Sequence, residues 1–425
     1  MNTIEFPSPQ EWIKICKRPE MDDEFLESRV ASILNVVKAK GDEALKIFTL
    51  QFDKVELKEM VVTEEEFEEA VRGCDMALKK AIDQARANIE KFHLSQVKKV
   101  EVIQTTEGVD CWRKSVPIDK VGLYIPGGTA PLFSTLLMLG IPAIIAGCRE
   151  IILCTPLDQE GKIDPTILYT ANLLGLKKIF KVGGVQAIAA MAYGTATVPR
   201  VLKIFGPGNQ FVAVAKQLVN RDGVAIDMLA GPSELAIIAD DSSVPRYVAA
   251  DLLSQAEHGV DSQVMLVSHQ KEVIKKVEEQ IEIQLEDLPR KNIAQESLEN
   301  SRAILVEGID QAIEFVNAYA PEHLIICCKN EDEVANRIEN AGSVFLGNYS
   351  PESVGDYASG TNHTLPTNGS AKTQSGISID SFVKKITFQK LSKQGLKNIG
   401  ETVELMAEAE QLTAHKNAVS IRLKD

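Results

Sequence analysis

The stretch Val121-Gly-Leu-Tyr-Ile-Pro-Gly-Gly128 is the first of a series of short apolar runs that alternate with amphipathic segments. After it we expect strands at 151–155, 179–182 and 202–205, and helices at 132–146, 165–174, 185–193 and 211–219. A second alternating run follows, with strands at 235–239, 264–267, near 324 and at 344–346, and helices at 247–257 and 273–285. Because strands that alternate with helices form βαβ units, the sequence predicts an α/β fold with two units and mostly parallel sheets.

The flanking residues follow other patterns. Ser8-Pro9-Gln10-Glu11 and the pair Thr63 and Glu66 have capping-box spacing, and apolar residues recur with helical period up to about His93. We therefore expect the first part of the chain to be mainly helical, with β-type alternation from about Val97. Residues 348–376 are rich in Ser, Thr, Asn and Gly, which predicts a long and functional loop. After it we expect a strand at 382–388, a helix at 391–410 and a final segment at 412–423.

Composition limits the class of protein. The 425 residues are too many for one ordinary core, and 44% hydrophobic with 25% charged residues are typical of a soluble globular protein. The 46 basic and 60 acidic residues give a net charge of −14, so we expect neither a nucleic-acid nor a membrane partner. The longest apolar stretch, Leu132 to Cys148, is interrupted by Gly140, Pro142 and Gly147, and we do not expect it to span a membrane.

The seven cysteines are odd in number and form no Cys-x-x-Cys pair, which indicates a reducing compartment and offers no thiolate metal site. The first residues resemble no targeting peptide, so we expect a cytoplasmic protein. A cysteine nucleophile is not favoured, because Cys111, Cys148 and Cys154 have no neighbouring His or helix start that would lower a thiol pKa.

Tyr319-Ala-Pro-Glu322-His323-Leu places a carboxylate beside an imidazole, between a helix-like segment and an apolar run. Proline disfavours helical geometry in the residue before it, so Glu322 and His323 are expected at a helix-to-strand turn, where side chains often face a cleft. Glu and His are common general acids and bases. The pattern alone also fits two solvated loop residues, which is what most Glu-His pairs are.

A metal site is a further hypothesis. Gln255 and His258 are three residues apart at the end of an amphipathic helix, so they share a face, and Asp356, His363 and His415 supply further oxygen and nitrogen donors. Such a mixed set favours zinc. These residues are scattered over more than a third of the chain, however, and the sequence alone leaves open whether they meet in space or are ordinary surface side chains.

Glycines cluster at Gly127-Gly128, Gly183-Gly184 and Gly206-Pro-Gly208-Asn209. The second and third clusters lie between an expected strand and an expected helix, where backbone N–H groups favour phosphate. None completes the Gly-x-Gly-x-x-Gly pattern, because Phe211 occupies the third glycine position. A nucleotide site and simple tight turns both remain compatible with these clusters.

Six motifs, in order from about Val121 to the C-terminus, resemble those of the histidinol dehydrogenase family. They are Tyr124-Ile-Pro-Gly-Gly-Thr-Ala-Pro-Leu, Gly231-Pro-Ser-Glu234, Leu253-Ser-Gln-Ala-Glu-His258, Pro321-Glu-His-Leu324, Gly355-Asp-Tyr-Ala-Ser-Gly-Thr-Asn-His363 and Glu408-Ala-Glu-Gln-Leu-Thr-Ala-His415. The resemblance implies an NAD-dependent enzyme that oxidises L-histidinol through L-histidinaldehyde to L-histidine, the last step of histidine biosynthesis, with one zinc ion per subunit and reduction of two NAD.

The resemblance also implies a role for each matching position. Glu322 and His323 would transfer protons, and the metal ligands would be Gln255, His258, Asp356 and His415. NAD would contact Tyr124, Gln186 and Asn209. The substrate site would comprise Ser233, His323, His363 and Glu410 together with the four metal ligands.

The implied architecture is a pair of incomplete Rossmann-like parallel-sheet domains with helical extensions at both ends, assembled as a homodimer with shared active sites. We expect an N-terminal helical arm at 1–21, a first α/β domain formed by 22–123 and 233–376 that carries most zinc and catalytic residues, and an NAD-binding domain at 124–232. Residues 377–425 would complete the active site of the partner subunit. Two alternatives are a zinc-dependent hydrolase that uses Glu322 and an inactive binding paralogue.

Overall fold

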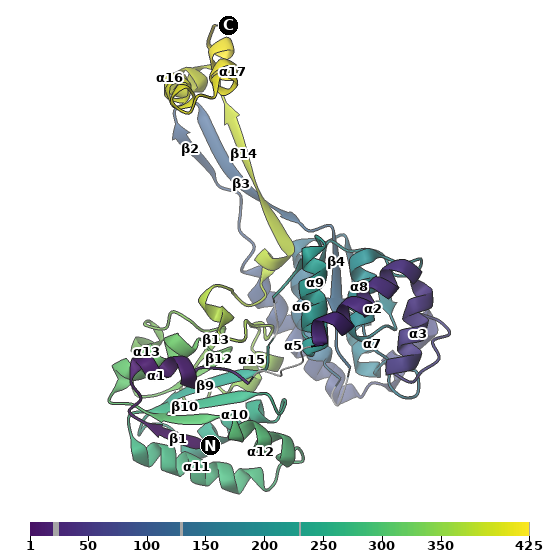
Figure 1. The fold of residues 1–425 in the computed structure, drawn as a ribbon, viewed down its shortest axis with the longest axis vertical. Helices are drawn as coiled ribbons and strands as arrows, with labels where there is room; N and C mark the ends of the chain where they lie inside the picture. The colour runs from purple at the N-terminus through teal and green to yellow at the C-terminus, as the bar shows by residue number, and fades with distance from the viewer. Residues whose placement is uncertain (20–24, 128–130, 229–230, 425) are drawn as a thin grey trace.

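The computed structural model describes residues 1–19, 25–127, 131–228 and 231–424. Two α/β bodies lie side by side, and a long β-arm leaves the second body and ends in two helices (Figure 1). Gly128 and the two residues that follow it in the first family motif lie outside the described residues. So do the predicted arm boundary at residue 21 and the two residues that precede Gly231.

The first body contains a six-stranded sheet in the order β1-β11-β10-β9-β12-β13, and all its pairings are parallel. Its strands are β1 (Asn2–Glu5), β9 (Glu234–Ala239), β10 (Gln263–Ser268), β11 (Arg302–Leu305), β12 (His323–Cys327) and β13 (Ser343–Leu346). One face packs on α10 (Pro245–Ala256), α11 (Lys271–Leu285) and α12 (Lys291–Glu299). The other packs on α1 (Pro9–Ile15), α13 (Ile309–Tyr319) and α14 (Glu331–Ala335).

The second body contains a five-stranded parallel sheet in the order β6-β5-β4-β7-β8. Its strands are β4 (Lys120–Tyr124), β5 (Glu150–Cys154), β6 (Lys178–Phe180), β7 (Lys203–Phe205) and β8 (Ala225–Ile226). One face packs on α2 (Leu26–Lys40), α3 (Asp42–Phe52), α8 (Gly184–Tyr193) and α9 (Gln210–Arg221). The other packs on α4 (Glu64–Gly73), α6 (Phe133–Ala146) and α7 (Pro165–Leu173), and α5 (Met76–Leu94) packs on α6.

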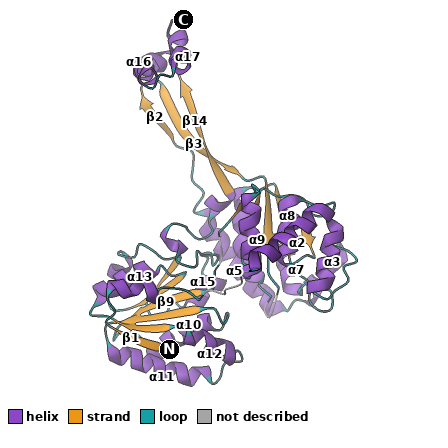
Figure 2. Cartoon of the chain, viewed as in Figure 1, coloured by secondary structure: helices purple, strands orange, loops and turns teal. Residues whose placement is uncertain are grey.

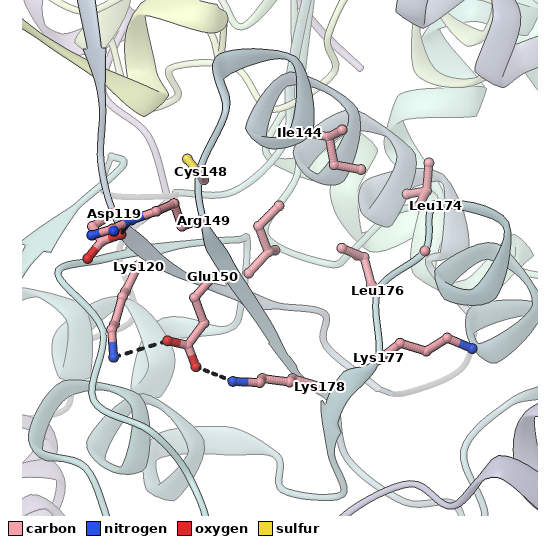
Figure 3. A pocket seen from close by; sticks show the side chains of 12 residues that line it. Asp119, Lys120, Ile144, Cys148, Arg149, Glu150, Leu174, Leu176, Lys177 and Lys178 are labelled. Carbon is pink, nitrogen blue, oxygen red and sulfur yellow. Dashed lines mark hydrogen bonds and ion pairs between the residues drawn. The ribbon is translucent and has the colours of Figure 1, made fainter.

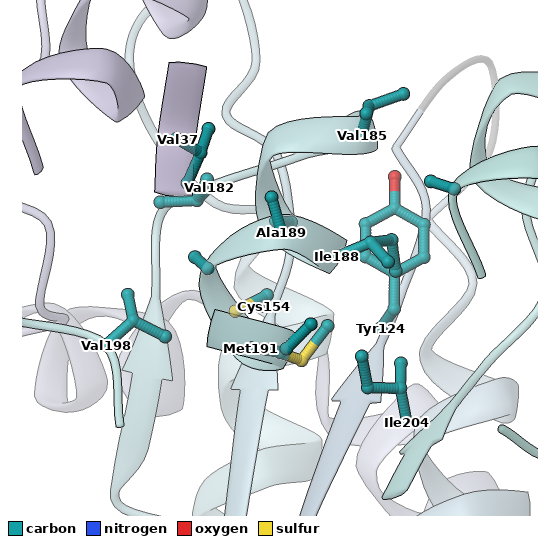
Figure 4. Packing of buried hydrophobic residues seen from close by; sticks show 14 of the residues in the cluster. Val37, Tyr124, Cys154, Val182, Val185, Ile188, Ala189, Met191, Val198 and Ile204 are labelled. Atoms are coloured by element: carbon teal, nitrogen blue, oxygen red, sulfur yellow. The ribbon is translucent and has the colours of Figure 1, made fainter. Parts of the chain in front are cut away.

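The strand β4 shows why the sheet of the second body forms. Val121 and Leu123 enter the core on one face, while Tyr124 enters the core on the other. Figure 4 shows Tyr124 and Ile204 packed with Ile188 of α8 in that second core. Strands that are apolar on both faces are typical of parallel sheets covered by helices on both sides.

The arm is an antiparallel sheet in the order β14-β3-β2, formed by β2 (Val102–Thr106), β3 (Val109–Pro117) and β14 (Val383–Leu391). The rings of Trp112 and Phe388 stack across it with centroids 5.4 Å apart. At its far end α16 (Lys393–Ala409) packs on α17 (Thr413–Lys424), well away from both bodies (Figure 2). Leu405, Met406 and Ile421 on these helices are about 60% exposed, so this tip leaves apolar surface uncovered within one chain.

The predicted α/β class, the two parallel sheets and the alternating elements are confirmed, and so are both capping boxes. Three expectations need correction. The first residues are not only a helical arm, because β1 pairs with β11 and completes the first sheet. The grouping of 22–123 with 233–376 is also wrong, because α2 to α5 and β4 pack in the second body. The predicted loop at 348–376 contains a short helix, α15 (Glu352–Tyr357).

Candidate active site

Glu322 and His323, the pair expected to transfer protons, lie at the amino end of the first sheet. The helix α13 ends at Tyr319, and Ala320 adopts a left-handed conformation with φ of 54° before Pro321 turns the chain into β12. Glu322 and His323 therefore sit at the start of a central strand, and both side chains are buried. The predicted helix-to-strand turn is confirmed, and the alternative of two solvated loop residues is excluded.

The main chain of Glu234 contacts both members of the pair. Its N–H donates to Oε2 of Glu322 at 3.0 Å, and its carbonyl oxygen lies 3.3 Å from Nδ1 of His323. Since a carbonyl only accepts, Nδ1 carries the proton of this bond. The other nitrogen, Nε2, is buried without a hydrogen-bond partner among the described residues and faces Oδ1 of Asp356 at 3.5 Å. His323 thus presents one ring nitrogen to the site.

The buried charges around His323 are mostly negative. Burial raises the pKa of Glu322, and burial also raises the pKa of Glu352. Burial opposes protonation of His323, but the neighbouring carboxylates Glu322, Asp356 and Glu352 outweigh it, so the pKa of His323 is raised. A pocket with three carboxylates around one imidazole has an electrostatic preference for a cation.

The short helix α15 brings Asp356 and Glu352 to this pocket from the predicted loop. The side chain of Gln255, at the end of α10, lies against Glu352. In the amide orientation that satisfies both groups, Gln255 donates to the two carboxylate oxygens at 2.9 and 3.1 Å. The carbonyl oxygen of Gln255 is then left for another partner. Ser254 also donates to Glu352, at 2.9 Å.

Two further imidazoles border the pocket. His363 donates from Nδ1 to the carbonyl oxygen of Asp356 at 2.9 Å, and its Nε2 lies 3.1 Å from Oγ1 of Thr135 on α6, so it links the two bodies. His258 follows α10, and its side chain is exposed to solvent. Desolvation by the surrounding protein atoms nevertheless lowers the pKa of His258. The negative charge of Asp356 opposes this effect more than any other charge. Both rings are therefore suited to act as neutral nitrogen ligands.

The donors fit a metal ion in part. Asp356 lies 3.5 Å from the unpartnered Nε2 of His323 and also interacts with His258, while Gln255 contacts Glu352 of the same cluster. Within the described ranges no group of three or more His, Cys, Asp or Glu residues is placed to hold a metal. The reason is that one of the three donors is a glutamine and that the fourth expected donor, His415, lies on α17 at the tip of the arm.

The residues expected to contact NAD surround one cavity of about 850 Å³ in the second body, with Tyr124, Gln186 and Asn209 in its wall. The hydroxyl oxygen of Tyr124 accepts a hydrogen bond from the N–H of Gly184 at 3.0 Å, and burial raises the pKa of Tyr124 to about 12. Asn209 caps α9 by accepting from the N–H of Val212. Two helix N-termini therefore open on this cavity.

A second cavity of about 650 Å³ continues toward the first body. It is lined by Ser233 and His258 and shares Asn209 and Phe211 with the larger cavity. Gly206 makes the close approach between the loops possible, because a Cβ there would lie 2.0 Å from the carbonyl oxygen of Tyr124. The two cavities together connect the helix N-termini of the second body with Ser233 and His258 of the first.

A third cavity of about 600 Å³ lies at the opposite end of β4 and β5, where Lys120 and Lys178 both pair with Glu150 (Figure 3). None of the predicted site residues lines it. Lys120 and Lys178 share one carboxylate, while Arg149 pairs with Asp119 and Lys177 pairs with Glu64.

Comparison with known proteins identifies the family. A protein-family model described as histidinol dehydrogenase matches residues 16–423. The histidinol dehydrogenase of Bacteroides thetaiotaomicron is 58% identical over 423 residues, which cover 100% of this chain and 99% of the relative. That of Campylobacter jejuni is 52% identical, with 96% and 95% covered. The chain belongs to the histidinol dehydrogenase family.

Solved structures agree with this family assignment. The crystal structure of histidinol dehydrogenase from Elizabethkingia anophelis matches with a TM-score of 0.98 and 54% identity, covering 100% of this chain and 98% of that chain. An acetylating aldehyde dehydrogenase from Geobacillus thermoglucosidasius matches with a TM-score of 0.50 and 13% identity, covering 89% and 93%, and this likeness concerns the fold alone. The chain is thus an enzyme of the histidinol dehydrogenase family.

Within one chain, the structure brings together six of the residues predicted for catalysis, metal and substrate, namely Gln255, His258, Glu322, His323, Asp356 and His363. Ser233 lines the adjoining cavity. Glu410 and His415 are exposed at the tip of the arm and do not join this cluster. Two buried carboxylates were given no role by the sequence: Glu234, which ends the motif that begins at Gly231, and Glu352, which lies in no motif.

The structure agrees with the expectation that a cysteine nucleophile is not favoured. All seven are free thiols. Burial raises the pKa of Cys148 to about 11 and also raises the pKa of Cys154, so neither thiol is activated for attack on an aldehyde. Among the residues that the structure describes, no helix has the length and apolar character needed to cross a bilayer.

Proposed function

We propose that the enzyme oxidises L-histidinol through L-histidinaldehyde to L-histidine and reduces two NAD, with one zinc ion in each active site. The observation that carries this proposal is the position of the buried Glu322 and His323 pair. It lies in the same cluster as the donors Gln255, His258 and Asp356. His258 also lines a cavity that shares Asn209 with the larger cavity at Tyr124. The names of the relatives supply the substrate.

The metal would be held by the carbonyl oxygen of Gln255, an imidazole nitrogen of His258 and a carboxylate oxygen of Asp356. A zinc ion there would supply fixed attachment points for the nitrogen atoms of the substrate, which holds the carbinol carbon in place. Such a set of nitrogen and oxygen ligands is common for zinc, and it leaves room for a ligand from elsewhere. We assign that fourth position to His415 of a second copy.

His323 is the proposed base in both oxidations. Its Nδ1 is held by the carbonyl of Glu234, so in the neutral ring Nε2 is the nitrogen that takes the hydroxyl proton while a hydride leaves the carbinol carbon for NAD. Glu322 is proposed to take a proton from water as that water adds to the aldehyde. The hydrated aldehyde then loses a second hydride to a second NAD, and His323 again takes the hydroxyl proton. In total, one water and two NAD are consumed.

The remaining predicted contacts divide between substrate and cofactor. Ser233, His363 and Glu410 are proposed as further substrate contacts, and Tyr124, Gln186 and Asn209 as NAD contacts. The arm supports the proposed homodimer, because Glu410 and His415 lie exposed at its tip while the metal-type donors lie in the first body. In such a dimer each arm would complete the active site of the other subunit.

We also propose a cytoplasmic location, which the seven free cysteines support.

The test is to count NADH formed per L-histidinol consumed, with enzyme that has been treated with a chelator and then resupplied with zinc. We expect two NADH per substrate, activity lost with the metal and restored with zinc. A zinc-dependent hydrolase would release no NADH with any amino alcohol, and an inactive paralogue would bind L-histidinol in calorimetry without turnover. Either of these results would refute the proposal.

A further inference from the structure

Arg18 is a buried arginine far from the catalytic pair in sequence, and only 8% of its side chain is exposed. It follows α1 and reaches the amino end of the first sheet. Its guanidinium donates to both carboxylate oxygens of Glu234, from Nε at 3.0 Å and from Nη2 at 2.8 Å. The same Nη2 donates to the carbonyl oxygen of Tyr319 at 2.7 Å, and the guanidinium lies 3.9 Å from the centre of the Tyr319 ring.

Glu234 connects this arginine to the catalytic pair. Its side chain is fully buried and also accepts a hydrogen bond from the N–H of Asn368 at 2.6 Å. Its own main-chain N–H and carbonyl hold Glu322 and His323, as described above. The orientation of both proton-transfer side chains therefore depends on where Glu234 lies.

Arg18 also contacts the end of α13, which precedes Glu322 and His323 in the chain. Tyr319 is the last residue of α13, and the carbonyls at a helix end lack partners within the helix. Arg18 satisfies the carbonyl of Tyr319, while the Tyr319 hydroxyl donates to Gln263 at 3.0 Å. Ala320 then takes its left-handed conformation, two residues before Glu322. The guanidinium of Arg18 therefore contacts both segments that position Glu322 and His323, namely β9 at its first residue and the end of α13.

We propose that Arg18 is a positioning residue for proton transfer, which holds Glu234 and the end of α13 so that Glu322 and His323 keep the geometry that both oxidations need. This inference rests on the proposed function and extends it to the N-terminal segment. A lysine would not reproduce the arrangement, because its ammonium group lacks the planar fork that contacts two carboxylate oxygens and stacks on a ring.

The alternative is that Arg18 serves only to neutralise a buried carboxylate. The two roles separate in a double variant. Arg18→Met leaves Glu234 as an uncompensated buried charge and is expected to lower the melting temperature strongly, whereas Arg18→Met with Glu234→Gln removes both charges and should recover the melting temperature. The main-chain contacts of residue 234 and its place in β9 would remain, but its side chain would lack the two hydrogen bonds from the guanidinium, and the carbonyl oxygen of Tyr319 would lack its own.

We therefore expect the double variant to keep its KM values for L-histidinol and NAD within about twofold, with kcat for NADH formation reduced by about tenfold to hundredfold. Arg18→Lys should show the same loss of kcat with a smaller loss of stability. The matched control removes the exposed pair of Arg337 and Asp310, as Arg337→Met with Asp310→Asn, and should leave kcat unchanged.

Recovery of the wild-type kcat together with the melting temperature in the double variant would overturn the proposal, since neutralisation alone would then suffice. A wild-type kcat in Arg18→Lys would overturn it as well. Failure of the proposed function is a separate result, because the wild-type enzyme would then produce no NADH from L-histidinol.

Discussion

The amide of Gln255 is held by Glu352, with the amide nitrogen 2.9 and 3.1 Å from the two carboxylate oxygens. This contact fixes which end of the amide turns away from Glu352, and that end is the carbonyl oxygen. Groups that orient a metal ligand in this way typically change metal affinity when they are removed. Glu352 itself is 1% exposed, so no water competes for the contact.

Glu352→Ala is therefore expected to weaken zinc binding by about 10-fold to 100-fold. The measurement is competition with a chromophoric chelator, together with the absorption spectrum of cobalt-substituted enzyme, which reports the ligand set independently of activity. Glu314→Ala is the matched control, because Glu314 is exposed on α13. An unchanged zinc affinity in Glu352→Ala would show that Gln255 needs no such support or is not a ligand.

Glu322→Gln separates the two oxidations. The glutamine can still accept the hydrogen bond from Glu234 but cannot take a proton, so alcohol oxidation should be spared while aldehyde oxidation falls by about 100-fold or more. The two steps are compared by single-turnover NADH formation from L-histidinol and from L-histidinaldehyde. Equal losses in both steps would contradict the division of labour between Glu322 and His323.

Much of the fold could be predicted because the central strands contain continuous runs of apolar residues, as in Leu235 to Ala239, where all residues are buried. The position of α2 and α3 could not be predicted. An amphipathic stripe such as Val30, Leu34 and Val37 shows that a helix is buried, but it does not show which sheet covers it. The boundary between the two bodies was therefore placed wrongly.

The site was partly predictable for a related reason. Gln255 and His258 share a local spacing, and Glu322 is adjacent to His323, so short motifs contain them. Arg18 and Glu234 are 216 positions apart, and no local pattern joins them. The short helix that carries Glu352 and Asp356 was hidden because Ser, Gly and Tyr in this segment are weak helix formers, and its placement depends on tertiary packing.

A mixture of two inactive variants tests the shared active site. In a heterodimer of His258→Ala and His415→Ala, one site has both defects and the other has neither. Random reassembly makes half of the dimers mixed, so about a quarter of the wild-type activity should return, although each variant alone is inactive. Activity is measured after joint denaturation and refolding. No recovery from correctly sized dimers would place His415 outside the partner's site.

Asp53 gives a prediction about pH and stability. It lines the cavity that contains Tyr124, its Oδ2 is buried without a partner among the described residues, and burial raises its pKa to about 6. The folded state then binds the proton more tightly than the unfolded chain, whose Asp pKa is about 4. Stability should therefore fall as the pH rises from about 4 to 6 and stay lower above that window.

Asp53→Asn removes this penalty. The variant is expected to be more stable than the wild type at pH 8 and equally stable at pH 4. Since Asp53 is partly exposed, solvent screening limits the expected gain to about 1 kcal/mol. Urea unfolding at the two pH values measures the difference, and Asp83→Asn on the exposed face of α5 is the control. A gain that is equal at both pH values would show that packing, and not the charge of Asp53, causes it.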